Sequence, residues 1–287
     1  MIRQIAVMSG KGGAGKTSVT AALLKLLPEV VAVDGDVNAS NLPILLNLKK
    51  LSTSDYYAMD VAQIDTANCT RCGRCTEICA FNAIDLDVQG NYSVNDECEG
   101  CAACAWVCPA KCIDMVPHCS GTKYLSQLEN GFLLHADLIP GEDNSGKLIA
   151  DIRKQARTVS TEKGLDLILI DGPPGTSCQA IASITGVDMV LAVLEESLSG
   201  LSDYRRLAKL VESFRIPHLV LLNKSGIDPE LGKRIETVVA ENGGEIVARI
   251  PFDMEIPRSL SRRETLLDLP AYRPVIEGLC EKLFPHS

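Results

Sequence analysis

The start of the chain places a short apolar run directly before a glycine-rich loop and a stretch of helical spacing. The apolar run covers residues 2–8, the loop covers residues 9–16, and residues 17–27 repeat apolar side chains at helical intervals. From position 10 to position 17 the chain reads Gly-Lys-Gly-Gly-Ala-Gly-Lys-Thr. This order of strand, loop and helix predicts an α/β fold with the loop at the carboxyl edge of a sheet.

The loop at positions 10–17 fits the Walker A pattern of a phosphate-binding loop. Its glycines let backbone N–H groups turn toward phosphate oxygens, and the positive end of the following helix adds to this attraction. We expect Lys16 to neutralise the terminal phosphates and the Thr17 hydroxyl to bind Mg²⁺. The pattern therefore predicts an ATP or ADP site, which would also include Gly12, Gly13, Ala14, Gly15 and Ser18.

Further apolar runs are separated by segments of helical spacing, at residues 30–33, 165–170, 189–193, 218–222 and 246–250. Nearly continuous apolar strands are typical of a parallel sheet that is covered on both faces. The sequence therefore predicts a doubly wound α/β domain with a mostly parallel sheet, formed by residues 1–60 and 118–287.

The segment between these two parts, residues 61–117, is dense in Cys, Asn, Asp and Gly. It contains an internal repeat, because residues 69–85 match residues 98–114 without a gap. Each copy carries C-x₂-C-x₂-C-x₃-C spacing, which is the run that binds [4Fe–4S] clusters. We therefore expect a small inserted α+β domain of the bacterial two-cluster ferredoxin type, with two pseudo-symmetric halves.

The ligands of the two clusters follow from a feature of two-cluster ferredoxins, in which the fourth cysteine of each run binds the other cluster. We assign Cys69, Cys72, Cys75 and Cys108 to the first cluster, and Cys98, Cys101, Cys104 and Cys79 to the second. Zinc is the alternative, but zinc sites usually pair two ligands from each of two distant knuckles. Three closely spaced cysteines in each copy favour iron–sulfur clusters.

Four of the twelve cysteines are left over by this assignment. Cys112 aligns with Ala83 in the repeat, so we expect a small packed side chain there. Cys119 follows His118 and is a weak candidate for a labile metal site. Cys178 lies shortly after the motif at 171–175, and Cys280 is expected to be structural.

Composition excludes several classes of protein. The formal net charge of −9 removes the positive field that non-specific nucleic-acid binding needs. The first apolar stretch is too short for a signal or membrane segment. We therefore expect a cytoplasmic protein that binds no nucleic acid and does not insert into membranes, and whose cysteines bind metal rather than form disulfides.

An additional lysine in the loop, Lys11, gives the chain a resemblance to the deviant Walker A ATPases of the MinD/ParA/nitrogenase iron protein superfamily. The resemblance implies that Lys11 reaches across a dimer interface to the partner's nucleotide. Asp36 with Asn41 resembles switch I, whose aspartate orients the attacking water, and Asp171 resembles a Walker B aspartate that runs into switch II at 172–175. Asp34 is the alternative water-orienting group, because it alternates with Asp36 along one strand.

By the same resemblance, Lys11, Lys16, Asp36 and Asp171 are the catalytic residues, and Mg²⁺ is held by Thr17, Asp36 and Asp171. The adenine ring is enclosed by residues that follow two later strands, namely Asn223, Lys224, Pro251 and Asp253.

Three functions are compatible with these motifs. The first is a Mg²⁺-dependent ATPase, slow without its partner, that forms a homodimer or a heterodimer with a related ATPase. It would couple dimerisation to electron transfer, or to metallocluster assembly or maturation in a client protein. The second is a MinD-like positioning ATPase, and the third is a ferredoxin with only regulatory nucleotide binding. Two complete cluster motifs favour the first function over the second, and the intact loop lysines and aspartates favour it over the third.

Overall fold

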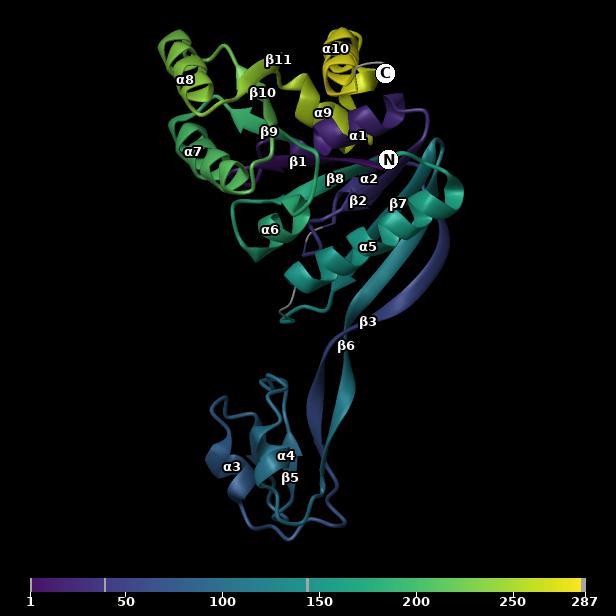
Figure 1. The fold of residues 1–287 in the computed structure, drawn as a ribbon, viewed down its shortest axis with the longest axis vertical. Helices are drawn as coiled ribbons and strands as arrows, with labels where there is room; N and C mark the ends of the chain where they lie inside the picture. Colours follow the sequence, from purple (N-terminus) through teal and green to yellow (C-terminus); the bar gives the residue numbers. More distant parts are fainter. Residues whose placement is uncertain (1, 39, 143–144, 285–287) are drawn as a thin grey trace. The chain divides into compact units, whose positions relative to one another are not determined.

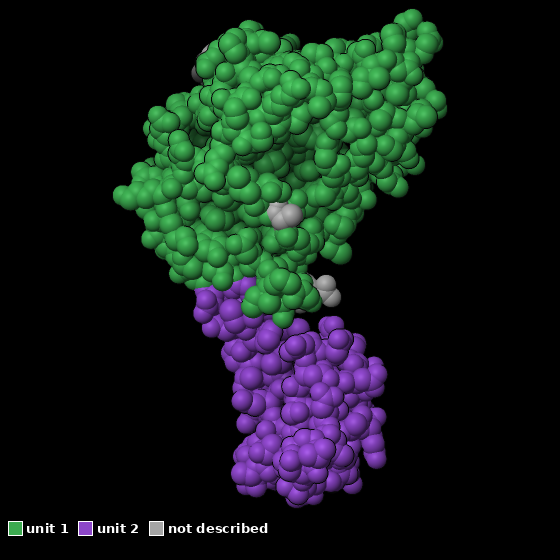
Figure 2. Space-filling model, turned by 180° about the vertical axis from the view of Figure 1, so that it is seen from behind, with its two compact units in different colours: residues 1–54, 122–287 green, residues 55–121 purple. Residues whose placement is uncertain are grey.

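The computed structural model describes residues 2–38, 40–142 and 145–284. The chain divides into two compact units, residues 1–54 with 122–287 and residues 55–121, which Figure 2 shows in separate colours. The predicted domain boundaries, after residues 60 and 117, fall within β3 (Lys49–Ile64) and β6 (Ile113–Leu128), which also contain the boundaries between the compact units.

The larger unit is built on a mixed sheet in the order β11-β10-β9-β1-β8-β2-β7-β6-β3, counted over the described residues. The seven strands from β11 to β7 are paired in parallel. The chain folds back from β6 into β7 after two residues. The prediction of a doubly wound, mostly parallel α/β sheet is confirmed. The parallel strands are β1 (Arg3–Ser9), β2 (Val30–Asp34), β7 (Gly131–Leu138), β8 (Leu167–Pro174), β9 (Met189–Glu195), β10 (His218–Ser225) and β11 (Glu245–Pro251).

Helices cover both faces of this sheet (Figure 1). The crossover from β1 to β2 runs in one direction along the sheet and those from β7 through to β11 run in the other, so right-handed connections place their helices on opposite faces. On one face α1 packs on α10, and on the other α5 packs on α6. The helices are α1 (Lys16–Leu26), α5 (Ser145–Lys163), α6 (Cys178–Ile184), α7 (Leu198–Ser213), α8 (Pro229–Glu241) and α10 (Arg273–Leu283), with the shorter α2 (Leu42–Leu45), α9 (Glu255–Ser261) and 3₁₀ turn η1 (Leu266–Asp268).

The core explains why the central strands read as continuous apolar runs. Four consecutive residues of β1, from Ile5 to Met8, are fully buried, because alternate side chains face the helices on the two sides. Val19 and Leu23 of α1 pack into the same apolar cluster as Ile276 and Leu279 of α10. Among the described residues, the helices do not combine the length and the apolar character needed to cross a membrane.

The smaller unit repeats its backbone as well as its sequence. Its elements are α3 (Arg74–Ile78), β4 (Ile84–Leu86), β5 (Tyr92–Val94) and α4 (Ala103–Val107), and β4 pairs antiparallel with β5. Left-handed residues recur at equivalent positions of the two copies, namely Arg71 and Gly100, Gly73 and Ala102, and Asn82 and Lys111. The two halves therefore follow the same local path, although a ferredoxin identity for this unit stays a prediction.

A buried arginine links two helices of the larger unit through hydrogen bonds. Arg153 of α5 donates from Nη1 to the carbonyl oxygens of Ala182 (2.6 Å) and Thr185 (2.9 Å), at the end of α6. Its Nη2 donates to Oε1 of Gln4 at 3.0 Å. Burial, with a smaller effect of Arg157, lowers the pKa of Arg153 to about 10. The guanidinium thus satisfies carbonyl groups that the end of a helix leaves without partners.

We predict that Arg153→Leu lowers the free energy of unfolding of the larger unit by about 3 kcal/mol, because it leaves buried acceptors unsatisfied. Urea denaturation followed by far-UV circular dichroism measures this loss. Arg157→Leu, on the exposed side of the same helix, is the matched control and should change stability by less than about 0.5 kcal/mol. Equal effects of the two substitutions would contradict the assigned role.

Candidate functional site

The glycine-rich loop connects the buried strand β1 to α1 with two residues in the left-handed region. Gly13 has φ 75° and Gly15 has φ 97°, and residues other than glycine adopt these backbone values only with strain. Gly15 is also the N-cap of α1, and a Cβ atom there would collide with the Asn223 side chain. The amide Nδ2 of Asn223 donates to the Ala14 carbonyl at 2.8 Å, so the carboxyl end of β10 supports the phosphate-binding loop.

Parallel pairing brings two carboxylate side chains to the same edge of the sheet. In the strand register, Asp171 of β8 lies opposite Val7 of β1 and Asp34 of β2. Asp171 accepts hydrogen bonds from Thr17 Oγ1 (2.7 Å) and Thr20 Oγ1 (2.9 Å). Thr17 and Asp171, two of the three predicted Mg²⁺ ligands, are therefore in direct contact. Thr20 was not anticipated, although it lies one helical turn after Lys16.

Burial determines the protonation behaviour of this edge. Lys16 is only 7% exposed, and this burial lowers its pKa although Asp171, Asp36 and Asp34 each act to raise it. Burial likewise raises the pKa of Asp171, against the opposing effects of the Thr17 hydrogen bond and the Lys16 charge. Burial and the nearby Asp171 raise the pKa of Asp34 to about 7. The bound phosphates and metal of a nucleotide complex would supply charges that this site lacks by itself.

The two candidate water-orienting aspartates have different surroundings. Asp34 is 1% exposed and accepts hydrogen bonds from Asp36 N (3.1 Å), Ser40 Oγ (2.8 Å) and Leu42 N (3.2 Å). Its carboxylate therefore holds the backbone of Asp36 and Leu42 and the side chain of Ser40 in place. Asp36 and Asn41 line the cavity that adjoins the glycine-rich loop. This arrangement favours Asp36 as the group that faces a nucleotide, with Asp34 as a residue that positions it.

A cavity of about 610 Å³ adjoins the loop and has the size of a small-molecule site. The predicted residues that line it are Gly12, Gly13, Gly15, Lys16, Thr17, Ser18, Asp36, Asn223, Lys224, Pro251 and Asp253. Lys11, Ala14 and Asp171 are not among the lining residues. An apolar wall from α9 and η1 was missed, although its helical spacing is visible in the sequence; its residues include Ile256, Pro257, Leu260 and Leu266.

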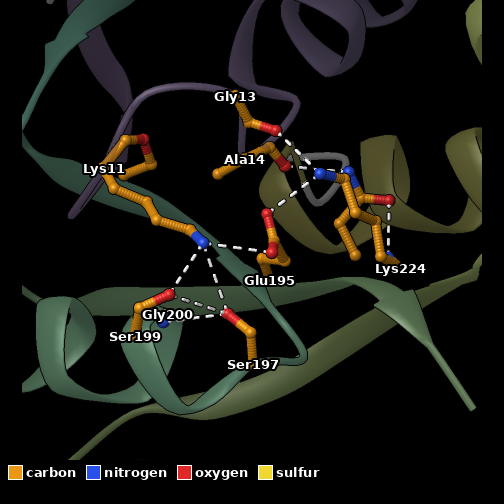
Figure 3. Close-up of polar contacts among 10 residues, drawn as sticks. Lys11, Gly13, Ala14, Glu195, Ser197, Ser199, Gly200 and Lys224 are labelled. Carbon is orange, nitrogen blue, oxygen red and sulfur yellow. Dashed lines mark hydrogen bonds and ion pairs between the residues drawn. The ribbon is translucent and has the colours of Figure 1, made fainter. Parts of the chain in front are cut away.

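Lys11 points into a polar cluster of its own chain (Figure 3). Its Nζ donates to Glu195 Oε1 (3.0 Å), Ser199 Oγ (3.0 Å) and Ser197 Oγ (3.3 Å). The other carboxylate oxygen of Glu195 accepts from Lys224 Nζ at 2.9 Å, and this ammonium also donates to the Gly13 carbonyl at 3.1 Å. Burial alone would raise the pKa of Glu195, but the hydrogen bonds from Lys224 and Lys11 hold it below its usual value.

This cluster links the two lysines through one carboxylate. Sequence reasoning did not include Glu195, although an acidic residue at the end of an apolar run, just before two serines, was a signal for it. The neighbouring Glu196 accepts three backbone hydrogen bonds, from the N–H groups of residues 226–228. The end of β9 therefore fixes both Lys224 and the loop that follows β10.

In the smaller unit, two cavities are each lined by four of the predicted cysteine ligands. The first is lined by Cys69, Cys72, Cys75 and Cys108, and the second by Cys79, Cys98, Cys101 and Cys104. This is the crossed grouping that the repeat predicts. Within the described residues, no group of three or more His, Cys, Asp or Glu side chains has the arrangement for binding a single metal ion.

The chemistry of these cavities fits an iron–sulfur cluster. All twelve cysteines are free, and thiolates are the usual ligands of such clusters. Backbone N–H groups donate to two of the sulfur atoms, from Arg71 to Cys69 Sγ (3.4 Å) and from Ala83 to Cys79 Sγ (3.3 Å). Hydrogen bonds of this kind stabilise negative charge on cluster ligands. That iron occupies the cavities stays a prediction.

The four other cysteines have different environments. Cys112 is buried, as expected, but its Sγ lies 3.5 Å from that of Cys108. Cys119 Sγ donates to the Gly121 carbonyl at 3.5 Å. Cys178 is exposed at the start of α6, and Cys280 packs against the apolar core through α10.

Comparison with known proteins identifies the family. Residues 5–266 match the model described as the CobQ/CobB/MinD/ParA nucleotide binding domain. The chain belongs to this family. The resemblance to MinD and ParA that the loop motifs indicate is therefore confirmed, and the larger unit is a P-loop ATPase domain of the MinD/ParA type.

Relatives and solved structures are consistent with this membership. An uncharacterised protein of Methanocaldococcus jannaschii is 32% identical over 93% of this chain and 91% of its own length. An iron–sulfur cluster carrier protein of Methanococcus maripaludis is 27% identical over 88% of this chain and 73% of its own length. The structure of the septum site-determining protein MinD from Pyrococcus horikoshii, complexed with Mg-ADP, covers 99% of this chain and 97% of that one with a TM-score of 0.60. At 21% identity it shows the shared fold alone.

The raised pKa of Asp34 gives the protein a testable pH dependence. The folded state binds a proton that the unfolded state releases near pH 4, so the free energy of unfolding should fall as pH rises from about 4 to about 7. We predict that Asp34→Asn, which cannot titrate, reduces this fall. Urea unfolding at pH 5 and pH 8, without nucleotide and with EDTA, measures the difference. Asp137→Asn, at an exposed position of β7, should follow the wild type, and a D34N protein with the wild-type pH profile would contradict the prediction.

Proposed function

We propose that the protein is an ATP-hydrolysing iron–sulfur protein. It would couple nucleotide-dependent dimerisation to electron transfer, or to metallocluster assembly or maturation in a client protein. The observation that carries this proposal is the presence, in one chain of the MinD/ParA family, of two cavities that are each lined by the four cysteines assigned to one cluster. A nucleotide switch and two redox-active sites in one chain favour a function that uses both.

The nucleotide chemistry would be distributed over the edge of the sheet. Lys16 and the backbone of the loop would hold the phosphates, with Thr17, Asp36 and Asp171 as ligands of Mg²⁺. The metal would neutralise charge that develops on the phosphate oxygens during transfer. Asp36, which lines the cavity, would orient the attacking water. The apolar wall beside Asn223 and Pro251 would enclose the adenine ring.

The cysteine cavities would hold one [4Fe–4S] cluster each. Crossed ligation joins the two halves of the repeat, which favours clusters that remain bound and hence electron transfer. The relatives named iron–sulfur cluster carrier proteins support the alternative of cluster delivery or maturation. Both versions require a client protein, and neither requires nucleic acid or a membrane. We propose a cytoplasmic location, as expected from the sequence.

A MinD-like positioning ATPase remains the second candidate, because the fold is shared with MinD structures. Cell positioning gives no role to two four-cysteine cavities, so it ranks below the first. A ferredoxin with only regulatory nucleotide binding ranks third, since the chain carries the loop lysines and the aspartates expected of a hydrolysing enzyme, and Thr17 lies in contact with Asp171.

The proposal is tested by measuring ATP hydrolysis by anaerobically purified protein with its clusters oxidised or reduced by dithionite. The electron paramagnetic resonance signal of the reduced protein is recorded with and without Mg-ATP. We expect the redox state to change turnover, or the nucleotide to change the signal. The proposed coupling would be contradicted if turnover did not change with the redox state and the signal did not change with Mg-ATP.

ATP hydrolysis and iron binding should be separable by single substitutions. We predict that Lys16→Ala reduces ATP turnover to background, because the terminal phosphates lose their cation, while the iron content per chain is unchanged. Colorimetric assays of phosphate release and of iron measure both. Lys25→Ala, on the exposed part of the same helix, is the control and should retain turnover. Joint loss of turnover and iron in K16A would refute independent sites.

Dimerisation requires Lys11 to leave its own subunit, if it acts on the partner's nucleotide. The ion pair with Glu195 opposes this exchange, and with side chains 28% and 17% exposed it contributes about 1 kcal/mol. Both subunits of a homodimer would lose this ion pair, about 2 kcal/mol in total, so we predict that Glu195→Gln forms the ATP-dependent dimer at about thirty-fold lower protein concentration. Sedimentation velocity at saturating Mg-ATP measures the dimer.

The control for this prediction is Glu212→Gln, at an exposed position of α7, which should match the wild type. The double variant K11A/E195Q should remain monomeric, because it lacks the cation that would cross the interface. A dimer of E195Q that is no stronger than that of the wild type would show that Glu195 does not retain Lys11.

A further inference from the structure

The two cysteine cavities differ in the number of sulfur atoms that line them. The first contains a fifth cysteine, Cys112, beside its four predicted ligands. The second contains four cysteines, and Ala83 is among its other lining residues. Cys112 and Ala83 occupy the same position of the internal repeat, so a methyl group in one half is replaced by a thiol in the other.

The backbone around these two positions is equivalent. Lys111 and Asn82, the preceding residues, are both left-handed, with φ 49° and 54°. Ile113 and Ile84, the following residues, are both buried in the same apolar cluster of the unit. The side chains at 112 and 83 therefore leave equivalent backbones, and each lies beside the fourth cysteine of its own run.

The sulfur atoms of Cys112 and Cys108 are close enough to compete for one position. Their Sγ atoms are 3.5 Å apart, and both residues line the first cavity. A change of χ1 rotamer moves a cysteine sulfur by about 3 Å, which is comparable to this separation. Cys112 is 5% exposed, so its thiol faces the cavity and the core of the unit rather than solvent.

We propose that Cys112 is an alternative fourth ligand of the first cluster site, which can replace Cys108. The inference rests on the proposed function, because it assumes that the cavity holds a [4Fe–4S] cluster. In the exchange, the bond between iron and Cys108 Sγ breaks and a bond between iron and Cys112 Sγ forms. The proton of the Cys112 thiol passes to the released Cys108 thiolate. The oxidation state of iron is unchanged, and no further reactant is needed.

The consequence is a functional asymmetry between two sites that share a backbone. The first site can exchange one ligand without losing four-cysteine coordination. The second site has Ala83 at the equivalent position and no fifth cysteine among its lining residues. A structural thiol that only fills space at position 112 would give no difference between the sites.

The test uses the repeat as its own control. Iron content per chain and the visible absorption of the clusters are measured after anaerobic reconstitution. The wild type should contain about eight iron atoms, in two clusters of four. Cys108→Ser should keep about eight, because Cys112 takes the vacant position, whereas the equivalent change in the other half, Cys79→Ser, should leave about four. The double variant C108S/C112A should also leave about four.

A transplanted thiol tests the same inference without relying on the stability of C108S. Cys79→Ser combined with Ala83→Cys should restore about eight iron atoms, because it gives the second site the arrangement of the first. Loss of one cluster in C108S together with no rescue in C79S/A83C would overturn the inference. Retention of both clusters in C108S/C112A would also overturn it, since Cys112 would then be unnecessary. A wild type that binds no iron would instead refute the proposed clusters.

Discussion

The parallel pairing of β1, β8 and β2 is the constraint on which the nucleotide site depends. It aligns Val7, Asp171 and Asp34 across three adjacent strands, so the glycine-rich loop and two carboxylates leave the sheet at one edge. Because the strands are covered on both faces, this edge is the place where buried charge can meet a ligand. The contacts from Thr17 and Thr20 to Asp171 follow from that alignment rather than from any local preference of α1.

Burial gives this edge its chemical character. Lys16 and Asp171 have pKa values shifted toward their neutral forms, chiefly because both side chains are removed from water. A bound nucleotide and its metal would compensate these desolvated charges. Near the same loop, Lys11 and Lys224 share the carboxylate of Glu195, so its single negative charge offsets one of their two positive charges. The site thus has two groups of charged side chains. Lys16 and Asp171 lie where phosphates and a metal would bind, whereas Lys11 and Lys224 pair with Glu195.

The smaller unit shows how an internal repeat can keep its backbone and change its chemistry. Left-handed residues recur at equivalent positions in both halves, and the crossed arrangement of cysteines requires the two copies to pack on each other, as α3 and α4 do. A single difference, Cys112 in place of Ala83, changes the number of sulfur atoms in one cavity. Symmetry of the fold therefore does not impose equivalence of the sites.

The sequence by itself determined the loop, the family, the cysteine repeat and the five apolar runs that became β2, β8, β9, β10 and β11, because these features are local or repeat at fixed spacing. It did not give β3, whose residues 49–55 are exposed and carry no apolar period, nor the place of β7 between β2 and β6. Strand order and the partnership of Lys11 with Glu195 depend on contacts between segments that only the folded chain brings together. Tertiary structure decided these because burial and pairing energies act between residues in space, whatever their separation in sequence.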